Sequence, residues 1–196
     1  MVDWNDCYVR GDTPWDKGAA SPVLEELLID HTPIGVTVIP GCGLGNDVQA
    51  ALAARAERVY AVDSAAAAIA VLSQTYGNKP SVYPVENDFF AWSLENLGIA
   101  DYVLEHTCFC AIPVAMRPLY VDSVWRVLKP GGRLLAAFYW RPRPVDDILL
   151  GPPFQTDKIE LEGLFTNRFT IEHLDIATVG FSDRLGREIM AVITKR

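Results

Sequence analysis

The stretch that most constrains the fold is VTVIPGCGLG at residues 36–45. Its mostly β-branched start predicts a buried parallel strand, and Pro40 ends this strand before three closely spaced glycines. The glycines are Gly41, Gly43 and Gly45. They can adopt positive φ angles and have no Cβ, so the backbone can approach a ligand closely. A helix is expected from Asn46 to Arg55, which would place that ligand at a helix N-terminus.

An acidic residue follows at the distance expected for a nucleoside site. A second strand, Arg58 to Val62, ends in Asp63, about 18 residues after Gly45, and ~20 is typical for an acid that binds ribose hydroxyls. The glycine loop alone does not separate nicotinamide cofactors from S-adenosylmethionine. The spacing is GxGxG rather than GxGxxG, however, and no second nucleotide-binding half follows. The sequence therefore favours S-adenosylmethionine.

The rest of the chain alternates helical and extended patterns. Helices are expected at 22–31, 65–76, 113–128 and 159–165, strands at 82–85, 100–104, 133–139, 169–179 and 187–194, and a proline-rich loop at 140–154. The alternation predicts a doubly wound, mostly parallel α/β sheet, and the last two strands predict an antiparallel C-terminal hairpin. We expect one domain over 1–196, in which 1–33 form an N-terminal lid and helix and 34–196 a Rossmann-like core.

Composition limits the partners. The formal net charge is −8, and no run of Lys or Arg is longer than the Lys195-Arg196 pair, so neither nucleic acid nor an anionic membrane is expected. No apolar stretch approaches the ~20 residues of a membrane span, and the N-terminus lacks a signal peptide pattern, which predicts a cytoplasmic protein. We expect a monomer that binds a small molecule. Four cysteines without CxxC spacing predict free thiols. His106, Cys108 and Cys110 alternate along the chain but have no obvious fourth metal ligand, so no metal is predicted.

Several polar and aromatic residues lie where strands end. Asp88 and Phe89 follow the third strand, where they either contact an adenine ring or form a helix N-cap with a core aromatic. His106 follows the fourth strand, where a structural and a catalytic role are both open. Trp4 and Trp15 precede the first strand and either fill the core edge or form a lid that faces a sulfonium cation.

Seven motifs occur in an order that resembles one enzyme family. They are TPWDKG at 13–18, PGCGLGND at 40–47, AVDSA at 61–65, NDFF at 87–90, FCAIPVAMRPLY at 109–120, LKPGGRLL at 128–135 and GPPF at 151–154. Nearly the whole chain resembles the thiopurine S-methyltransferase and halide/thiol methyltransferase family. LKPGG is common to many methyltransferases, whereas TPWD, PGCG, CAIPxxMR and GPPF together are specific. The resemblance implies a seven-stranded class I methyltransferase fold that binds S-adenosylmethionine at the carboxyl ends of the strands.

The resemblance also implies roles for individual residues. Trp4 and Trp15 would close over the cofactor, Gly41, Gly43 and Gly45 would face its methionine part, Asp63 would hold the ribose, Asp88 and Phe89 would flank the adenine, and Asp47, Ser64 and Glu105 complete the predicted cofactor-binding set. Relatives often have a tryptophan at the position of Tyr8, which predicts a looser lid. At His106 the thiopurine branch resembles Arg and the plant halide/thiol branch Tyr, whereas Tyr139 aligns with a tyrosine of the halide/thiol branch.

The predicted reaction is methyl transfer from S-adenosylmethionine to a thiol or hydrosulfide, or to a halide, with S-adenosyl-L-homocysteine as the second product. His106 and Tyr139 are the predicted catalytic residues: the imidazole would take the thiol proton, and the phenol would donate a hydrogen bond to the anion. The alternatives are a thiopurine or selenium/tellurium-compound methyltransferase, a nicotinamide-dependent oxidoreductase, and a non-catalytic S-adenosylmethionine-binding protein of the same fold.

Overall fold

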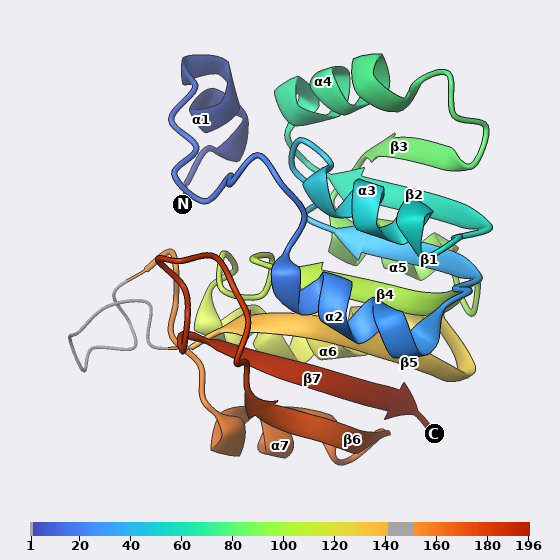
Figure 1. The fold of residues 1–196 in the computed structure, drawn as a ribbon, viewed down its shortest axis with the longest axis vertical. Helices are drawn as coiled ribbons and strands as arrows, with labels where there is room; N and C mark the ends of the chain where they lie inside the picture. Colours follow the sequence, from blue (N-terminus) through green and yellow to red (C-terminus); the bar gives the residue numbers. More distant parts are fainter. Residues whose placement is uncertain (1, 141–150) are drawn as a thin grey trace.

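Strands form one mixed sheet in the order β3-β2-β1-β4-β5-β7-β6, in a computed structural model that describes residues 2–140 and 151–196 (Figure 1). The strands are β1 (Val36–Pro40), β2 (Arg58–Asp63), β3 (Val82–Glu86), β4 (Ala100–His106), β5 (Leu128–Tyr139), β6 (Phe169–Ile176) and β7 (Glu188–Lys195). The first five are parallel, and β7 runs antiparallel between β5 and β6. The predicted mostly parallel, seven-stranded sheet with an antiparallel hairpin is confirmed.

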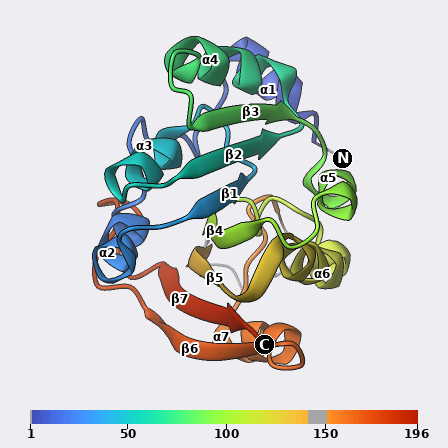
Figure 2. The same cartoon turned by 90° about the vertical axis from the view of Figure 1, so that its right-hand side faces the viewer.

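Helices cover both faces of the sheet, which Figure 2 shows between its two helical layers. One face packs against α2 (Pro22–His31), α3 (Asn46–Ala53) and α4 (Ala66–Tyr76), and the other against α5 (Phe89–Glu95), α6 (Arg117–Val127) and α7 (Lys158–Phe165). Alternate strand residues fill the two cores: in β5, Leu135 and Ala137 face the first layer, whereas Leu134 and Ala136 face the second. Within the described residues, no helix combines the length and the apolar character that crossing a membrane requires.

Three segments differ from the sequence prediction. A short helix, α1 (Trp4–Arg10), forms near the N-terminus, where the Asp3 side chain caps its first turn, and it packs against α4. The helix expected at 113–128 divides into a 3₁₀ turn (Val114–Met116) and α6, because Pro118 suits the first turn of a new helix. Strand β5 starts at Leu128, which pairs with Ala100, so the LKPGG motif belongs to the strand. Most of the loop predicted at 140–154 lies outside the described residues.

The strand order determines where a ligand is expected. From β1 the chain continues to β2 and β3 on one side, and then crosses to β4 and β5 on the other. In open α/β sheets, ligands bind outside the carboxyl ends of the strands at such a reversal point. The glycine loop follows β1 and His106 ends β4, so both are placed at this crevice.

Candidate active site

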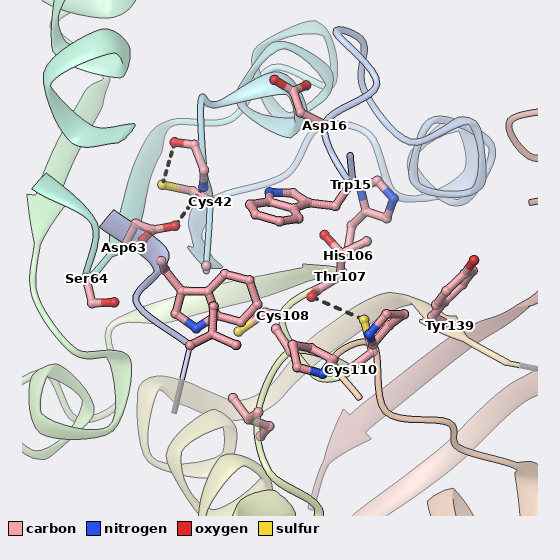
Figure 3. A pocket seen from close by; sticks show the side chains of 18 of the residues that line it. Trp15, Asp16, Cys42, Asp63, Ser64, His106, Thr107, Cys108, Cys110 and Tyr139 are labelled. Carbon is pink, nitrogen blue, oxygen red and sulfur yellow. Dashed lines mark hydrogen bonds between the residues drawn. The ribbon is translucent and has the colours of Figure 1, made fainter. Parts of the chain in front are cut away.

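A cavity of about 1490 Å³ opens at the carboxyl ends of β1 and β4. Ligand pockets usually occupy roughly 300–1,000 Å³, so this one has room for a nucleoside cofactor and a small second substrate. Figure 3 shows Asp63 and Ser64 on one side, which we call the β2 end, and His106 and Tyr139 on the other, which we call the β5 end. Trp15 lies between the two ends. The cavity therefore joins two chemically different surfaces.

The glycine loop leaves no room for side chains on its cavity side. Gly41 and Gly43 line the cavity with φ angles of +58° and +51°. A Cβ on Gly41 would lie 2.9 Å from the Cys108 Sγ atom, and one on Gly43 would lie 2.6 Å from the Tyr8 hydroxyl oxygen. Both positions therefore need glycine for space as well as for backbone conformation.

Gly45 has a different role from the one expected. It is not among the residues that line the cavity, and it forms the N-cap of α3 with a φ angle of +86°. A Cβ there would lie 2.8 Å from the Leu72 Cδ1 atom, on the α4 side of the loop. Gly45 therefore does not line the cavity as predicted, and its missing side chain allows the glycine loop to pack closely on α4.

Asp63 holds the glycine loop in place. One carboxylate oxygen accepts a hydrogen bond from the Gly43 amide and the other from the Ala65 amide, each at 2.9 Å. Burial raises the pKa of Asp63, and these backbone hydrogen bonds partly oppose that rise. A carboxylate has about four acceptor sites, so the two bonds leave capacity for ligand hydroxyls. Asp63 and the neighbouring Ser64 both line the cavity.

Asp88 and Phe89 have the structural roles of a helix N-cap and a core aromatic, and they also line the cavity. The Asp88 side chain caps α5 by accepting from the Ala91 amide at 3.0 Å, and Phe89 is buried with its ring centroid 5.9 Å from that of Tyr120. Both residues also border the β2 end of the cavity. A structural role in the helix therefore coexists with a position suited to an adenine ring.

Glu105 is placed away from the cavity, contrary to the prediction. The residue is fully buried and is absent from the cavity lining. Its oxygens accept hydrogen bonds from the Phe109 amide, at 2.8 Å, and from the Tyr120 hydroxyl. Burial raises the pKa of this carboxyl to about 7, although both bonds oppose the rise. Glu105 therefore fixes the turn after β4, where Thr107 has a φ angle of +69°, and its side chain does not line the cavity as predicted.

Both ring nitrogens of His106 are engaged. Nδ1 lies 2.9 Å from the Asp47 carboxylate, and Nε2 lies 2.8 Å from the Arg184 guanidinium. Arginine can only donate, so Nε2 accepts and the imidazole is neutral, with its hydrogen on Nδ1 directed at Asp47. Asp47 also accepts from the Ser21 amide at 2.8 Å. A base would accept the thiol proton on the lone pair of Nε2, and that lone pair already accepts a hydrogen bond from Arg184. This geometry argues against the proton-accepting role predicted for His106.

Arg184 is a residue of the site that no sequence motif indicated. It lies in the turn between β6 and β7, is 5% exposed and borders the β5 end of the cavity. Its Nη2 donates to the Trp15 carbonyl at 2.9 Å, and its guanidinium carbon lies 5.4 Å from the centroid of the Tyr139 ring. The Glu188 carboxylate lies 3.7 Å from Nη1, too far for a hydrogen bond. Burial raises the pKa of Glu188.

Three aromatic residues of the N-terminal segment, Trp4, Tyr8 and Trp15, line the cavity. The rings of Trp4 and Trp15 meet edge to face at 5.3 Å, and the Trp15 indole donates to the Tyr8 hydroxyl at 3.2 Å. That hydroxyl packs against Gly43, and burial raises its pKa. Tyr8 therefore packs between Trp15 and the glycine loop. This geometry does not support the looser N-terminal segment that tyrosine at this position predicted.

Three cysteines also border the cavity, namely Cys42, Cys108 and Cys110. All are free thiols, and burial raises the pKa of each, that of Cys110 to about 12. They are therefore held as neutral thiols, which are weak nucleophiles. Within residues 2–140 and 151–196, no group of His, Cys, Asp and Glu side chains is arranged to hold a metal ion.

Comparison with known proteins identifies the family. Residues 1–184 match the family model described as thiopurine S-methyltransferase. The chain belongs to this family. Thiocyanate methyltransferase 1 of Arabidopsis thaliana is 35% identical over 158 residues, which are 79% of this chain and 66% of that protein. Probable thiol methyltransferase 2 of the same plant is 31% identical over 81% of this chain and 69% of its own length.

More distant matches agree with this assignment. A thiopurine S-methyltransferase of Vibrio campbellii is 28% identical over 65% of this chain and 63% of its own length. The chain thus spans about two thirds of the length of these curated relatives. A Burkholderia thailandensis N1-methyltransferase structure superposes with a TM-score of 0.76 at 20% identity, over 99% of this chain and 85% of that one. At that identity the likeness supports the fold alone, which is that of a methyltransferase.

Proposed function

We propose that this chain transfers the methyl group of S-adenosylmethionine to a small soft nucleophile, in the first place a thiol, hydrosulfide or thiocyanate, and next a halide. The observation that carries the proposal is the family match over residues 1–184, joined to a cavity at the reversal point of the sheet. The relatives named for thiocyanate and thiol are more similar to this chain than those named for thiopurine, which favours a small sulfur acceptor.

The β2 end of the cavity fits the cofactor. Gly41 and Gly43 allow a ligand to approach the backbone closely, and Asp63 has acceptor capacity for ribose hydroxyls. Trp4 and Trp15 present aromatic rings that suit a sulfonium cation. The remaining proposed contacts are Ser64, Asp88 and Phe89 at the nucleoside, and Asp47 beside the loop.

The β5 end suits the acceptor. Arg184, Tyr139 and His106 border it, and among them only Arg184 is always positively charged. A cation within a few ångströms favours the ionised form of a thiol, whose ordinary pKa is ~8.5. The acceptor can therefore enter or ionise as an anion without a base, and its proton leaves to solvent. His106 donates to Asp47 from Nδ1 and accepts from Arg184 at Nε2, and so orients Arg184 in this scheme.

S-Adenosylmethionine supplies a methyl group that is already activated, which an aligned nucleophile takes by in-line displacement. The chain therefore contributes mainly orientation and exclusion of water. The acceptor end holds the anion beside Arg184 and Tyr139, and the tryptophans of the N-terminal segment cover the cofactor end. This division assigns one substrate to each end of the cavity.

The test is methyl transfer from labelled S-adenosylmethionine to a panel of thiols, hydrosulfide, thiocyanate, iodide, a thiopurine and a selenol. We expect label in the small sulfur acceptors first and in iodide next. Faster methylation of the thiopurine or the selenol would refute the proposed small sulfur acceptor and assign the chain to that substrate class instead. Binding of S-adenosylhomocysteine without any transfer would indicate a non-catalytic binding protein. Thermal stabilisation by NADH, but not by S-adenosylhomocysteine, would overturn the cofactor assignment.

A further inference from the structure

Two distant parts of the chain are joined at one side chain, Arg184. Its Nη1 donates to His106 at the end of β4, and its Nη2 donates to the Trp15 carbonyl in the N-terminal segment. One residue away, Asp183 forms an ion pair with Lys17 at 2.7 Å. The turn between β6 and β7 is therefore fastened to the segment that covers the cavity, at two adjacent points.

The acceptors of Arg184 are both neutral. One is a ring nitrogen and the other is a backbone carbonyl, while the Glu188 carboxylate makes no hydrogen bond with any described residue. Arg184 is nevertheless 5% exposed, and its charge is paired with the Glu188 carboxylate at 3.7 Å, a distance too long for a hydrogen bond. An anion in the cavity would add a hydrogen-bonded charged partner to that ion pair. In the placement that its bond to Trp15 fixes, the guanidinium lines the cavity, where it can also contact such an anion.

Since the bond to the Trp15 carbonyl fastens the lid, an anion that stabilises this placement also stabilises the closed lid. We propose that Arg184 is a positioning residue that couples binding of the acceptor anion to closure of the N-terminal segment over the cofactor. The inference rests on the proposed function, because it assigns the acceptor to the β5 end and the cofactor to the β2 end. Coupling between two ligands is reciprocal, and typical factors run from about 5-fold upward.

The planar fork of Arg184 matters as much as its charge. A guanidinium can donate to His106 and Trp15 from two separate nitrogens while it faces a third group, whereas an ammonium is a single point charge. Arg184→Lys therefore keeps the positive charge and loses the fixed bridge. The variant separates attraction of an anion from coupling of that anion to the lid.

The experiment is calorimetry of S-adenosylhomocysteine binding with and without saturating iodide. S-adenosylhomocysteine has no methyl group to transfer, so iodide binds beside it without reacting. We expect iodide to lower the Kd of S-adenosylhomocysteine at least about 5-fold, and S-adenosylhomocysteine to lower the Kd of iodide by the same factor. Sulfate at equal ionic strength controls for salt. In Arg184→Lys the coupling factor should fall to about 1, with iodide binding still measurable. The control Arg168→Gln removes an exposed ion pair with Asp122 and should retain the full factor.

The outcomes separate this inference from the proposed function. Independent binding of the two ligands to the wild-type chain would overturn the coupling while cofactor binding stands. Full coupling in Arg184→Lys would overturn the bridging role of the guanidinium fork. Failure of the wild-type chain to bind S-adenosylhomocysteine at all would overturn the proposed function itself. The wild-type measurement decides the coupling even if the variant does not fold.

Discussion

Replacing Glu105 with glutamine should remove one contribution to the pH dependence of the free energy of unfolding. The carboxyl is fully buried, and its pKa is raised from 4.5 to about 7 mainly by that burial. Below pH ~4.5 it is protonated in the folded and the unfolded chain alike. Between the two pKa values the unfolded chain releases its proton while the folded chain keeps it, so stability falls as pH rises. Glu105→Gln has no such proton and should not show this loss.

The size of the effect follows from the raised pKa. Each pKa unit corresponds to ~1.36 kcal/mol, so the full loss attributable to Glu105 is roughly 3 kcal/mol, of which about 2.5 kcal/mol falls between pH 5 and pH 8. Glutamine can still accept from the Phe109 amide, and its amide can donate to the Tyr120 hydroxyl. The substitution therefore removes the titration while it preserves the shape of the turn.

Urea unfolding of both proteins at several pH values between 5 and 8 measures this effect. The free energy of unfolding of Glu105→Gln, minus that of the wild type, should rise by about 2.5 kcal/mol over the range. The difference cancels every other titrating group that the two proteins share. The variant Glu95→Gln, at an exposed carboxylate, is measured beside it as a control. A difference that stays constant from pH 5 to pH 8 would refute the argument that Glu105 is protonated in the folded state.

Three further predictions concern the cavity. Asp63→Asn should weaken S-adenosylhomocysteine binding about 10- to 100-fold by calorimetry, because hydrogen bonds to a charged group contribute ~1.5–3 kcal/mol; unchanged affinity would remove Asp63 from the cofactor site. His106→Gln should lower methylation of a thiol and of iodide by the same factor at pH 7 and pH 9, because the imidazole orients Arg184; a larger loss for the thiol at pH 7 would restore the base. Cofactor binding should change Trp15 fluorescence and slow trypsin cleavage after Lys17, and identical digestion would return the segment to a purely structural role.

Local patterns were sufficient to predict most of the fold. The strand, glycine loop and helix at residues 36–53 are encoded by neighbouring residues, so their order follows from the local sequence. Spacing predicted that all three glycines face a ligand, whereas only Gly41 and Gly43 line the cavity. The early start of β5 could not be predicted in this way. Lys129 to Gly132 have turn-forming composition, and they become strand only because Leu128 pairs with Ala100 on β4. That pairing joins residues far apart in the sequence.

The candidate site was harder to predict because it depends on register. Glu105 and His106 are neighbours at the end of β4, so their side chains point to opposite faces. The sequence does not say which face is the cavity, and both were predicted to lie there. Arg184 was missed because its turn has no motif. It reaches the cavity because β7 pairs antiparallel with β5, which places Glu188 opposite Tyr139.

The charges that line the cavity bear on how an acidic protein would hold the anionic acceptor proposed above. Six aspartates and two permanently basic side chains are among the described residues there: Asp3, Asp16, Asp47, Asp63, Asp88, Asp183, Lys17 and Arg184. Lys17 is already paired with Asp183. Arg184 has the Glu188 carboxylate 3.7 Å away, but its hydrogen bonds, among the described residues, go to neutral acceptors. With a net charge of −8 the long-range field repels anions, so selection of the acceptor depends on contact with this one guanidinium. The six aspartates of the lining favour a sulfonium cation. In this proposal the aspartates therefore attract the cofactor, whereas Arg184 attracts the acceptor anion.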